Sequence, residues 1–265
     1  MAKAQYVGVD GVAREVTKNY VGVSGVARNV TNGYVGVDGV AREFFSSSPY
    51  YHGGVPVSSF DVGDTVTLNW FGEEQDFIVV HSGNPSAVIY DSSCDGTWLL
   101  QKYLTTTSRT WGENLEFIDS NLYDYMDYCN GLPALEEHIM DGVKTVKIPY
   151  VSNAANRTVQ QGSNGLSTQF FLLSGQEVGF MEDVDDSNLP VDGYVLDYFL
   201  NATNTTRKCY DQTVSGYGHW ALRSPVLGSS NVFYVDGYGA LSTINKISSV
   251  LTPRMAFILD NDTLV

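Results

Sequence analysis

The chain of 265 residues is long enough for one large domain, or for one medium-sized domain with an appendage. Binding to a phosphate backbone or to an anionic membrane needs clustered Lys and Arg. The net charge of −15 argues against both, so neither is an expected partner. Charged residues make up only 17% of the chain, while Gly and aromatic residues are abundant, which is typical of a β-rich fold with tight turns.

Residues 1–45 contain a 14-residue unit written almost three times. Each copy places Asp-Gly or Ser-Gly between valines, the signal for a tight hairpin turn. Folding the first copy about this turn pairs Val9 with Val12 and Val7 with Arg14. We therefore predict three β-hairpins that anchor or oligomerise the protein, because an isolated hairpin is only marginally stable. A flexible, low-complexity linker is the alternative interpretation.

A connector rich in Ser, Pro and Gly follows over residues 46–59, and the main domain is expected over residues 60–265. Its first element is a predicted hairpin of strands 64–70 and 75–81. Further strands are predicted over residues 144–150, 168–173, 219–225, 231–241 and 253–259.

Two helices are predicted between these strands. Apolar residues at helical spacing indicate one over 120–129, with Ser120 or Asp119 as its N-cap, and the other begins at Pro133. Ser174 and Glu177 have capping-box spacing, which predicts a further short helix. Residues 154–165 are polar and rich in Gly, as expected for a surface loop.

Several stretches of the main domain resemble an uncharacterised domain family of phages and prophages of Gram-positive gut bacteria, whose members are labelled only as unknown or as amidases. The repeat also resembles one found in phage virion proteins beside such domains. The matching stretches lie at residues 79–100, 146–150, 164–180, 220–225 and 253–259.

The order of the late motifs, Trp-x-x-Arg-Ser followed by a hairpin and a closing strand with Arg254, is similar to C-type-lectin-like folds. This resemblance implies an α+β fold, namely a C-type-lectin-like domain of short antiparallel strands with two helices, preceded by the hairpin module. The family order of Arg before Pro is reversed here at Pro253, so the last strand could enter its sheet differently.

The amidase label directs attention to Cys94 and His81, since a Cys–His pair in contact can activate a thiolate. A buried cysteine at a turn is the favoured interpretation, and no catalytic residue is assigned. The three cysteines are odd in number and without metal-ligand spacing, so neither a disulfide framework nor a cofactor is expected.

An acidic run follows the predicted strand 168–173 and could offer oxygen ligands to calcium. It lacks the central Gly and the terminal Glu of an EF-hand loop, so a solvated loop is favoured and no metal site is assigned. The run comprises Glu182, Asp183, Asp185, Asp186 and Asn188.

Aromatic residues gather around the late strands, where they could stack on sugar rings or anchor a protein partner. The candidate ligand-binding residues are Tyr217, Trp220, Tyr234 and Tyr238. For Trp220 a place in the core is the favoured alternative. Arg223 and Arg254 are expected to pair with carboxylates inside the domain.

These observations predict a non-enzymatic phage virion protein of the tail, baseplate or head surface, displaying its main domain for adhesion to the host surface. Residues 6–45 are expected to bind other virion proteins and to form a homo-oligomer. No signal peptide is expected, which fits synthesis in the host cytoplasm. The alternatives are a cell-wall amidase that uses Cys94 and His81, and a purely architectural protein that binds nothing.

Overall fold

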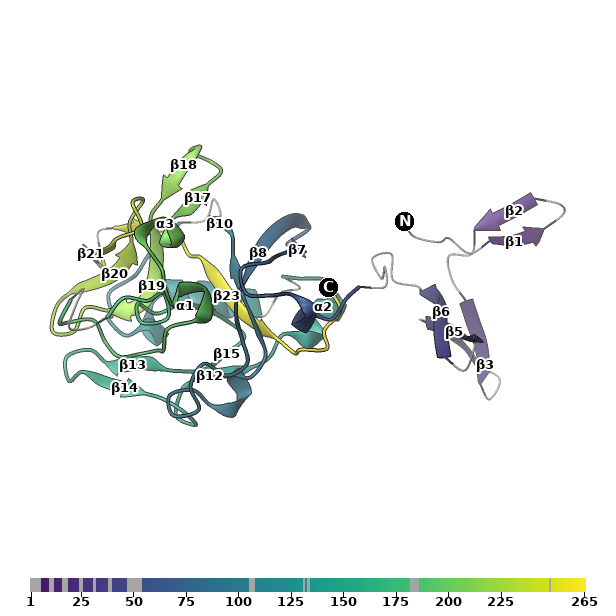
Figure 1. Ribbon diagram of the computed structural model, residues 1–265, viewed down its shortest axis with the longest axis horizontal. Coiled ribbons are helices and arrows are strands. Elements are labelled where there is room, and N and C mark those ends of the chain that lie inside the picture. Colours follow the sequence, from purple (N-terminus) through teal and green to yellow (C-terminus); the bar gives the residue numbers. More distant parts are fainter. Residues whose placement is uncertain are drawn as a thin grey trace. The chain divides into compact units, whose positions relative to one another are not determined.

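The computed structural model describes residues 54–104, 108–130, 132, 134–181, 186–247 and 249–265, together with the backbone of six strands in residues 1–53. The chain divides into two compact units, Met1–Val55 and Pro56–Val265. Figure 1 draws both units.

The first unit contains three two-stranded antiparallel sheets. In the first, Val9 pairs with Val12 and Val7 with Arg14, the register that folding about an Asp-Gly turn implies. The turn residues themselves lie outside the described part of the chain. The strands are β1 (Tyr6–Val9), β2 (Val12–Glu15), β3 (Asn19–Val23), β4 (Val26–Val30), β5 (Asn32–Val37) and β6 (Val40–Ser46).

The second unit is built on a five-stranded sheet of order β16-β23-β9-β8-β7. Phe71 and Gly72 connect β7 to β8, and both have positive φ, 51° and 88°, as a type I′ hairpin turn requires. The predicted hairpin is therefore confirmed. The strands are β7 (Thr65–Trp70), β8 (Glu73–Ser82), β9 (Thr97–Gln101), β16 (Phe170–Leu172) and β23 (Met255–Leu259).

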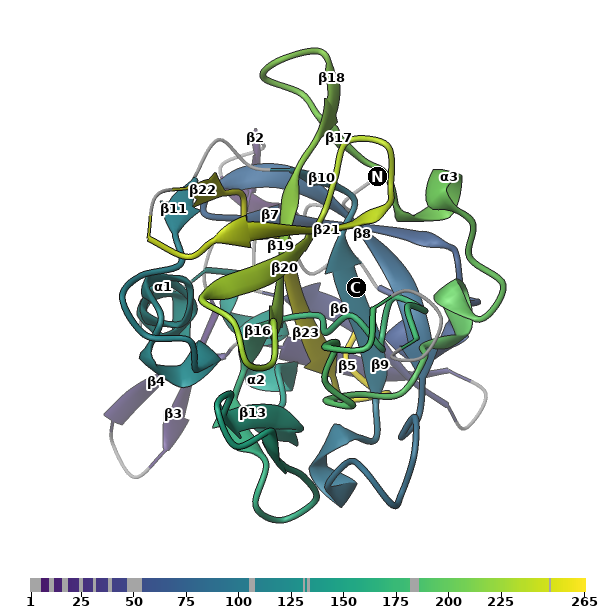
Figure 2. The same cartoon turned by 90° about the vertical axis from the view of Figure 1, so that its left-hand side faces the viewer.

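A three-stranded antiparallel sheet, β19-β20-β21, lies in front of β16 and β23 in Figure 2. Backbone hydrogen bonds tie its first strand to the rest of the unit, from Arg223 N to Leu173 O and from Ala221 N to Thr252 O. The three strands are β19 (Trp220–Pro225), β20 (Asn231–Val235) and β21 (Leu241–Asn245).

Smaller sheets complete the strand structure. β10 and β17 pair in parallel, and β18 joins β17 in an antiparallel hairpin. β11 pairs with β22, β12 with β15, and β13 with β14. These strands are β10 (Tyr103–Leu104), β11 (Arg109–Thr110), β12 (Val146–Ile148), β13 (Tyr150–Asn153), β14 (Thr158–Gln160), β15 (Leu166–Thr168), β17 (Cys209–Asp211), β18 (Gly216–Gly218) and β22 (Val250–Leu251).

Helices are short in the described part of the chain: α1 (Asn121–Asn130), α2 (Glu137–Gly142) and α3 (Asn204–Arg207), with four 3-10 turns between strands. The predicted first helix is confirmed, since the Ser120 hydroxyl accepts a hydrogen bond from Tyr123 N at 3.0 Å as an N-cap does. α2 begins at Glu137, and the predicted start at residue 133 lies outside the described residues.

The predicted fold class, a C-type-lectin-like α+β domain, is wrong. Strands make up 38% of the chain, and they form several small antiparallel sheets with no two-helix lectin-like arrangement in the described residues. Two local predictions are also wrong, a surface loop and a short helix. Residues 154–165 belong partly to the β13–β14 hairpin, and the Ser174–Glu177 pair makes its capping bonds in a turn that does not continue as a helix.

The larger of two hydrophobic clusters forms the main core of the second unit, and it takes apolar side chains from Val57 to Leu259, while Val151, Ala154 and Leu227 form a small second cluster. Aromatic rings pack edge to face at its centre, with centroids 5.3 Å apart for Trp70 and Phe170 and 5.2 Å apart for Phe77 and Phe257. Because β23 lies between β16 and β9, the last strand of the chain is central to this core.

Candidate functional site

The structure brings two of the predicted aromatic residues together at the surface, Tyr217 in β18 and Tyr238 in the turn between β20 and β21. Their exposed fractions are 55% and 78%. Tyr210 in β17 lies directly opposite Tyr217 in the hairpin and is 39% exposed. The β17–β18 hairpin projects from the domain at the top of Figure 2.

The rings of this hairpin have defined positions. Tyr210 and Tyr217 meet edge to face, with ring centroids 5.9 Å apart and an interplanar angle of 90°. The Lys208 ammonium lies 5.1 Å from the centroid of the Tyr217 ring, within range of a cation–π interaction. These contacts orient the Tyr217 ring while leaving more than half of the residue exposed.

The turn that carries Tyr238 packs tightly against neighbouring backbone. Asp236 Oδ1 accepts hydrogen bonds from Tyr238 N at 2.8 Å and from Ala240 N at 2.9 Å, which closes the turn. A Cβ on Gly237 would lie 2.8 Å from the carbonyl oxygen of Tyr217, so only glycine allows this approach.

Together these residues form what we call the tyrosine surface: Tyr210, Tyr217, Tyr238 and Lys208. Tyr210 and Lys208 are not among the residues predicted from the sequence. The sequence does contain a pattern that points to Tyr210. Two segments of the form x-Tyr-x flank residues 212–215, and a hairpin folded about the centre of this stretch pairs Tyr210 with Tyr217.

The other two predicted residues do not reach this surface. Trp220 is fully buried, its indole nitrogen donates to Arg207 O at 3.1 Å, and its assignment to a ligand site is corrected to the core. Tyr234 is half-buried and packs on His219 with ring centroids 5.4 Å apart.

Cys94 and His81 are not joined by any hydrogen bond or ion pair among the described residues. The Cys94 thiol is fully buried and donates to Lys147 O at 3.3 Å, while His81 Nδ1 lies 2.9 Å from Asp197 Oδ2. Burial, followed by the negative charge of Glu177, raises the pKa of Cys94 to about 12. Such a thiol stays protonated and is a poor nucleophile.

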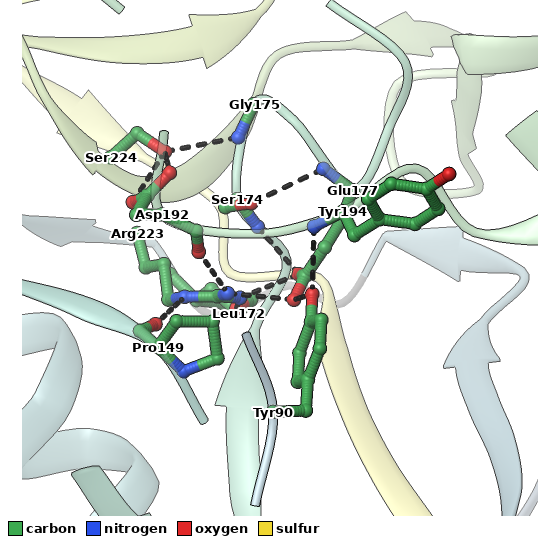
Figure 3. Close-up of polar contacts among 10 residues, drawn as sticks. All are labelled: Tyr90, Pro149, Leu172, Ser174, Gly175, Glu177, Asp192, Tyr194, Arg223 and Ser224. Carbon is green, nitrogen blue, oxygen red and sulfur yellow. Dashed lines mark hydrogen bonds and ion pairs between the residues drawn. The ribbon is translucent and has the colours of Figure 1, made fainter. Parts of the chain in front are cut away.

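A buried polar network centred on Arg223 lies inside the domain (Figure 3). Its guanidinium pairs with Glu177 through bonds of 2.5 Å and 2.6 Å, and further bonds reach the carbonyl oxygens of Pro149, Leu172 and Asp192. The expected internal ion pair of Arg223 is thereby confirmed. Because all its donors are used, this charge is satisfied inside the protein.

Tyr90 and the backbone of Ser174 complete the hydrogen bonding of Glu177, and Ser224 and Asp192 extend the network. Tyr90 donates its hydroxyl to Glu177 Oε1 at 2.6 Å and accepts a bond from Tyr194 N at 3.0 Å. Ser224 donates to the Asp192 carboxylate at 2.9 Å, and burial raises the pKa of Asp192 to about 7. The network holds the loop 186–196 on the core, and none of its carboxyl groups is open to a substrate.

Arg254 departs from its expected pairing with a carboxylate. It donates to Gln101 O at 2.7 Å, and its guanidinium lies 4.9 Å from the ring centroid of Trp220. The described residues give its Nη1 no hydrogen-bond partner. Cation–π contact and a carbonyl group therefore replace the ion pair.

The described residues contain no group of three or more His, Cys, Asp or Glu side chains that could hold a metal ion. Residues 182–185 of the acidic run lie outside the described chain. Among the described helices, none is long and apolar enough to cross a membrane.

Comparison with protein-family models gives a match over residues 95–261, which is more than half of the chain. The chain belongs to the family described as Domain of unknown function (DUF6273). The family region includes the Arg223 network apart from Tyr90, and the whole tyrosine surface. Neither the curated proteins nor the solved structures gave a match.

Proposed function

We propose that this protein is a non-enzymatic structural component of a phage particle, on the tail, baseplate or head surface, and that it adheres to the host cell surface. The family domain binds through the tyrosine surface, and the N-terminal hairpins hold the protein to other virion proteins and to further copies of itself. The tyrosine surface is the observation that carries this proposal.

Three exposed tyrosine rings on a β-hairpin and an adjoining tight turn suit binding better than folding. Each ring offers apolar area and a hydroxyl group at low conformational cost, which is why tyrosine is enriched at recognition surfaces. Tyr217 and Tyr238 are more than half exposed, so neither is needed to fill the core. The surface is accordingly available to a sugar ring or to a protein partner.

The hairpin module supports the assembly part of the proposal. Its six strands pair only within three separate two-stranded sheets in the described backbone. A lone two-stranded sheet is marginal in water, so association with other chains would stabilise the module.

An amidase that uses Cys94 is the second candidate, and the geometry supports it less. The thiol is buried with a raised pKa, and His81 lies against Asp197 instead, with Nδ1 2.9 Å from Oδ2. Substituting Cys94 with Ala separates the two proposals, because adhesion needs no thiolate. Loss of host adsorption or of cell-wall hydrolysis in a well-folded Cys94→Ala variant would favour the enzyme.

The adhesion proposal is tested with the fluorescently labelled full chain and purified cell walls of Gram-positive gut bacteria. Tyr217→Ala and Tyr238→Ala should each weaken binding about tenfold, since an aromatic contact residue commonly contributes more than 1.4 kcal/mol. Tyr128→Ala is the matched control, because Tyr128 is 63% exposed on α1, away from the tyrosine surface. Equal binding by all three variants, or no binding by the unchanged chain, would contradict the proposal.

A further inference from the structure

Strand β7 forms one edge of the five-stranded sheet, and β8 is its only strand partner among the described residues. Edge strands of soluble proteins are commonly blocked by Lys, Pro, a bulge or a covering element. β7 reads Thr-Val-Thr-Leu-Asn-Trp and carries no charge and no Pro. Its register with β8 runs without interruption from Thr65↔Ile78 to Trp70↔Glu73, so it has no bulge.

The hydrogen-bond parity of the hairpin shows which backbone groups of β7 point outward. In a two-residue hairpin the residues next to the turn, here Trp70 and Glu73, form a hydrogen-bonded pair, and the pairs alternate from there. Asp76 O accepts from Lys102 N at 2.9 Å, so Asp76 points its backbone toward β9. Its partner Thr67 therefore points its N–H and C=O away from β8.

By the same alternation, Thr65 and Asn69 also point their backbone groups outward. Thr65 and Thr67 are exposed and Asn69 is half-buried, while Val66, Leu68 and Trp70 between them are buried on the core side. The free edge thus presents one N–H donor and one C=O acceptor at each of Thr65, Thr67 and Asn69. No hydrogen bond from the described residues uses them.

We propose that this edge pairs with β7 of a second copy of the chain, antiparallel and about a two-fold axis at Thr67. In this register Thr67 lies opposite the partner's Thr67, and Thr65 lies opposite the partner's Asn69. By symmetry Asn69 lies opposite the partner's Thr65. All three pairs use outward-pointing groups on both chains, so the edge is complementary to itself as a two-fold interface requires. The two five-stranded sheets become continuous.

The side chains of β7 are compatible with β7 of a second copy as the partner. On the solvent face the pairs join Thr with Thr and Thr with Asn, which are compatible across strands, and no like charges oppose each other. On the core face Val66 lies opposite the partner's Leu68, so apolar side chains continue across the seam. Asp76, the nearest acidic residue of β8 on the solvent face, is neutralised by Lys102 at 3.2 Å.

The net charge of residues 56–265 gives the β7 pairing a salt dependence opposite to that of an ion pair. Residues 1–55 hold five Lys and Arg and four Asp and Glu, so residues 56–265 hold ten basic and 26 acidic residues, a net charge of −16. Two such domains repel each other, and added salt screens this repulsion. Association through β7 should therefore strengthen as salt is raised.

Cysteine cross-linking of the full chain tests both the pairing and its register. Thr67→Cys places two thiols on Cα atoms about 5.5 Å apart, within reach of a disulfide. Asn69→Cys places its thiols on Cα atoms about 14 Å apart, beyond that reach. Under mild oxidation at high salt, Thr67→Cys should give at least about tenfold more disulfide-linked dimer than Asn69→Cys. The native cysteines Cys94, Cys129 and Cys209 are buried.

Mixing supplies the matched control. Thr65→Cys and Asn69→Cys should each fail to cross-link alone but should form a mixed dimer when combined. Thr67→Lys opposes two charges at an exposed position; it removes the hydrogen bond from the Thr67 hydroxyl to Asp76 but leaves the backbone bonds of the hairpin intact, and it should abolish the salt-promoted increase in sedimentation coefficient. Equal cross-linking of Thr67→Cys and Asn69→Cys, absence of any cross-link, or unchanged sedimentation of Thr67→Lys would each overturn the proposal.

Discussion

Arg223 and Glu177 show how single residues organise this domain. Both are fully buried, and the ion pair is completed by Tyr90, Ser174 and backbone carbonyl groups. Removing one member of such a pair strands the other charge and costs about 3–5 kcal/mol, whereas replacing both by apolar groups can be neutral. The network therefore specifies the position of the loop 186–196 more than it adds net stability.

Asp192 gives this network a pH dependence. Its carboxyl group has a folded-state pKa of about 7 against 3.8 when unfolded, so the folded protein holds an extra proton between these values. The free energy of unfolding should therefore fall as pH rises from about 4 to about 7, by at most about 4 kcal/mol from this group. Urea unfolding of the wild type and of Asp192→Asn across this range checks the prediction.

Asn at position 192 keeps the acceptor for Ser224 and cannot titrate. The variant should lose the downward slope and should be more stable than the wild type at pH 8. The same slope in both proteins would show that Asp192 is ionised throughout the range and that other groups cause the dependence.

The turn between β20 and β21 illustrates how an element acquires its place from close backbone contacts. Gly239 has a φ of +83°, and a Cβ there would collide with the carbonyl oxygen of Asn204 in α3. Glycine at this position therefore supplies both the left-handed conformation and the space for α3. Tyr238 owes its exposed position to the glycines on either side.

Gly239→Ala should destabilise the domain by more than 2 kcal/mol and should weaken cell-wall binding, because strain and a backbone collision combine at one residue. Gly228→Ala is the matched control. It has a φ of +72°, but nothing lies within 4 Å of its added Cβ, so it should cost only about 1 kcal/mol and leave binding intact. Thermal unfolding and the cell-wall assay distinguish the two, and equal effects would argue against the packing role of Gly239.

At the scale of the whole molecule, the chain distributes its charge unevenly between its two units. Residues 56–265 carry the net charge of −16 and both described hydrophobic clusters. The hairpin module holds nearly balanced charge. The second unit therefore contains a hydrophobic core of its own, with which it can fold alone. The hairpin module can associate without strong electrostatic repulsion between its copies.

Deleting residues 1–55 should leave the thermal midpoint of the second unit within about 2 °C of its value in the full chain, since the described core runs from Val57 to Leu259. The apparent mass at matched concentration should fall, because the hairpins no longer associate. Calorimetry and light scattering measure the two effects. A midpoint lowered by more than about 5 °C would mean that the module stabilises the domain directly.

Turn chemistry and short-range periodicity were sufficient for some of the local elements. An Asp-Gly pair between valines predicts the register of the β1–β2 hairpin, and a serine before residues spaced three and four apart predicts α1 and its cap. Such elements depend on residues within one or two turns of each other, so a short window of sequence contains their physical cause.

Tertiary packing alone determined the remainder. Glu177 makes its capping bond with Ser174 and also pairs with Arg223, 46 residues away, and no short window of sequence contains this second partner. Trp220 lies in the core and Tyr238 at the surface, although both are aromatic and near in sequence. Burial depends on which strands meet across the whole chain, and the free edge of β7 is likewise a property of the assembled sheet.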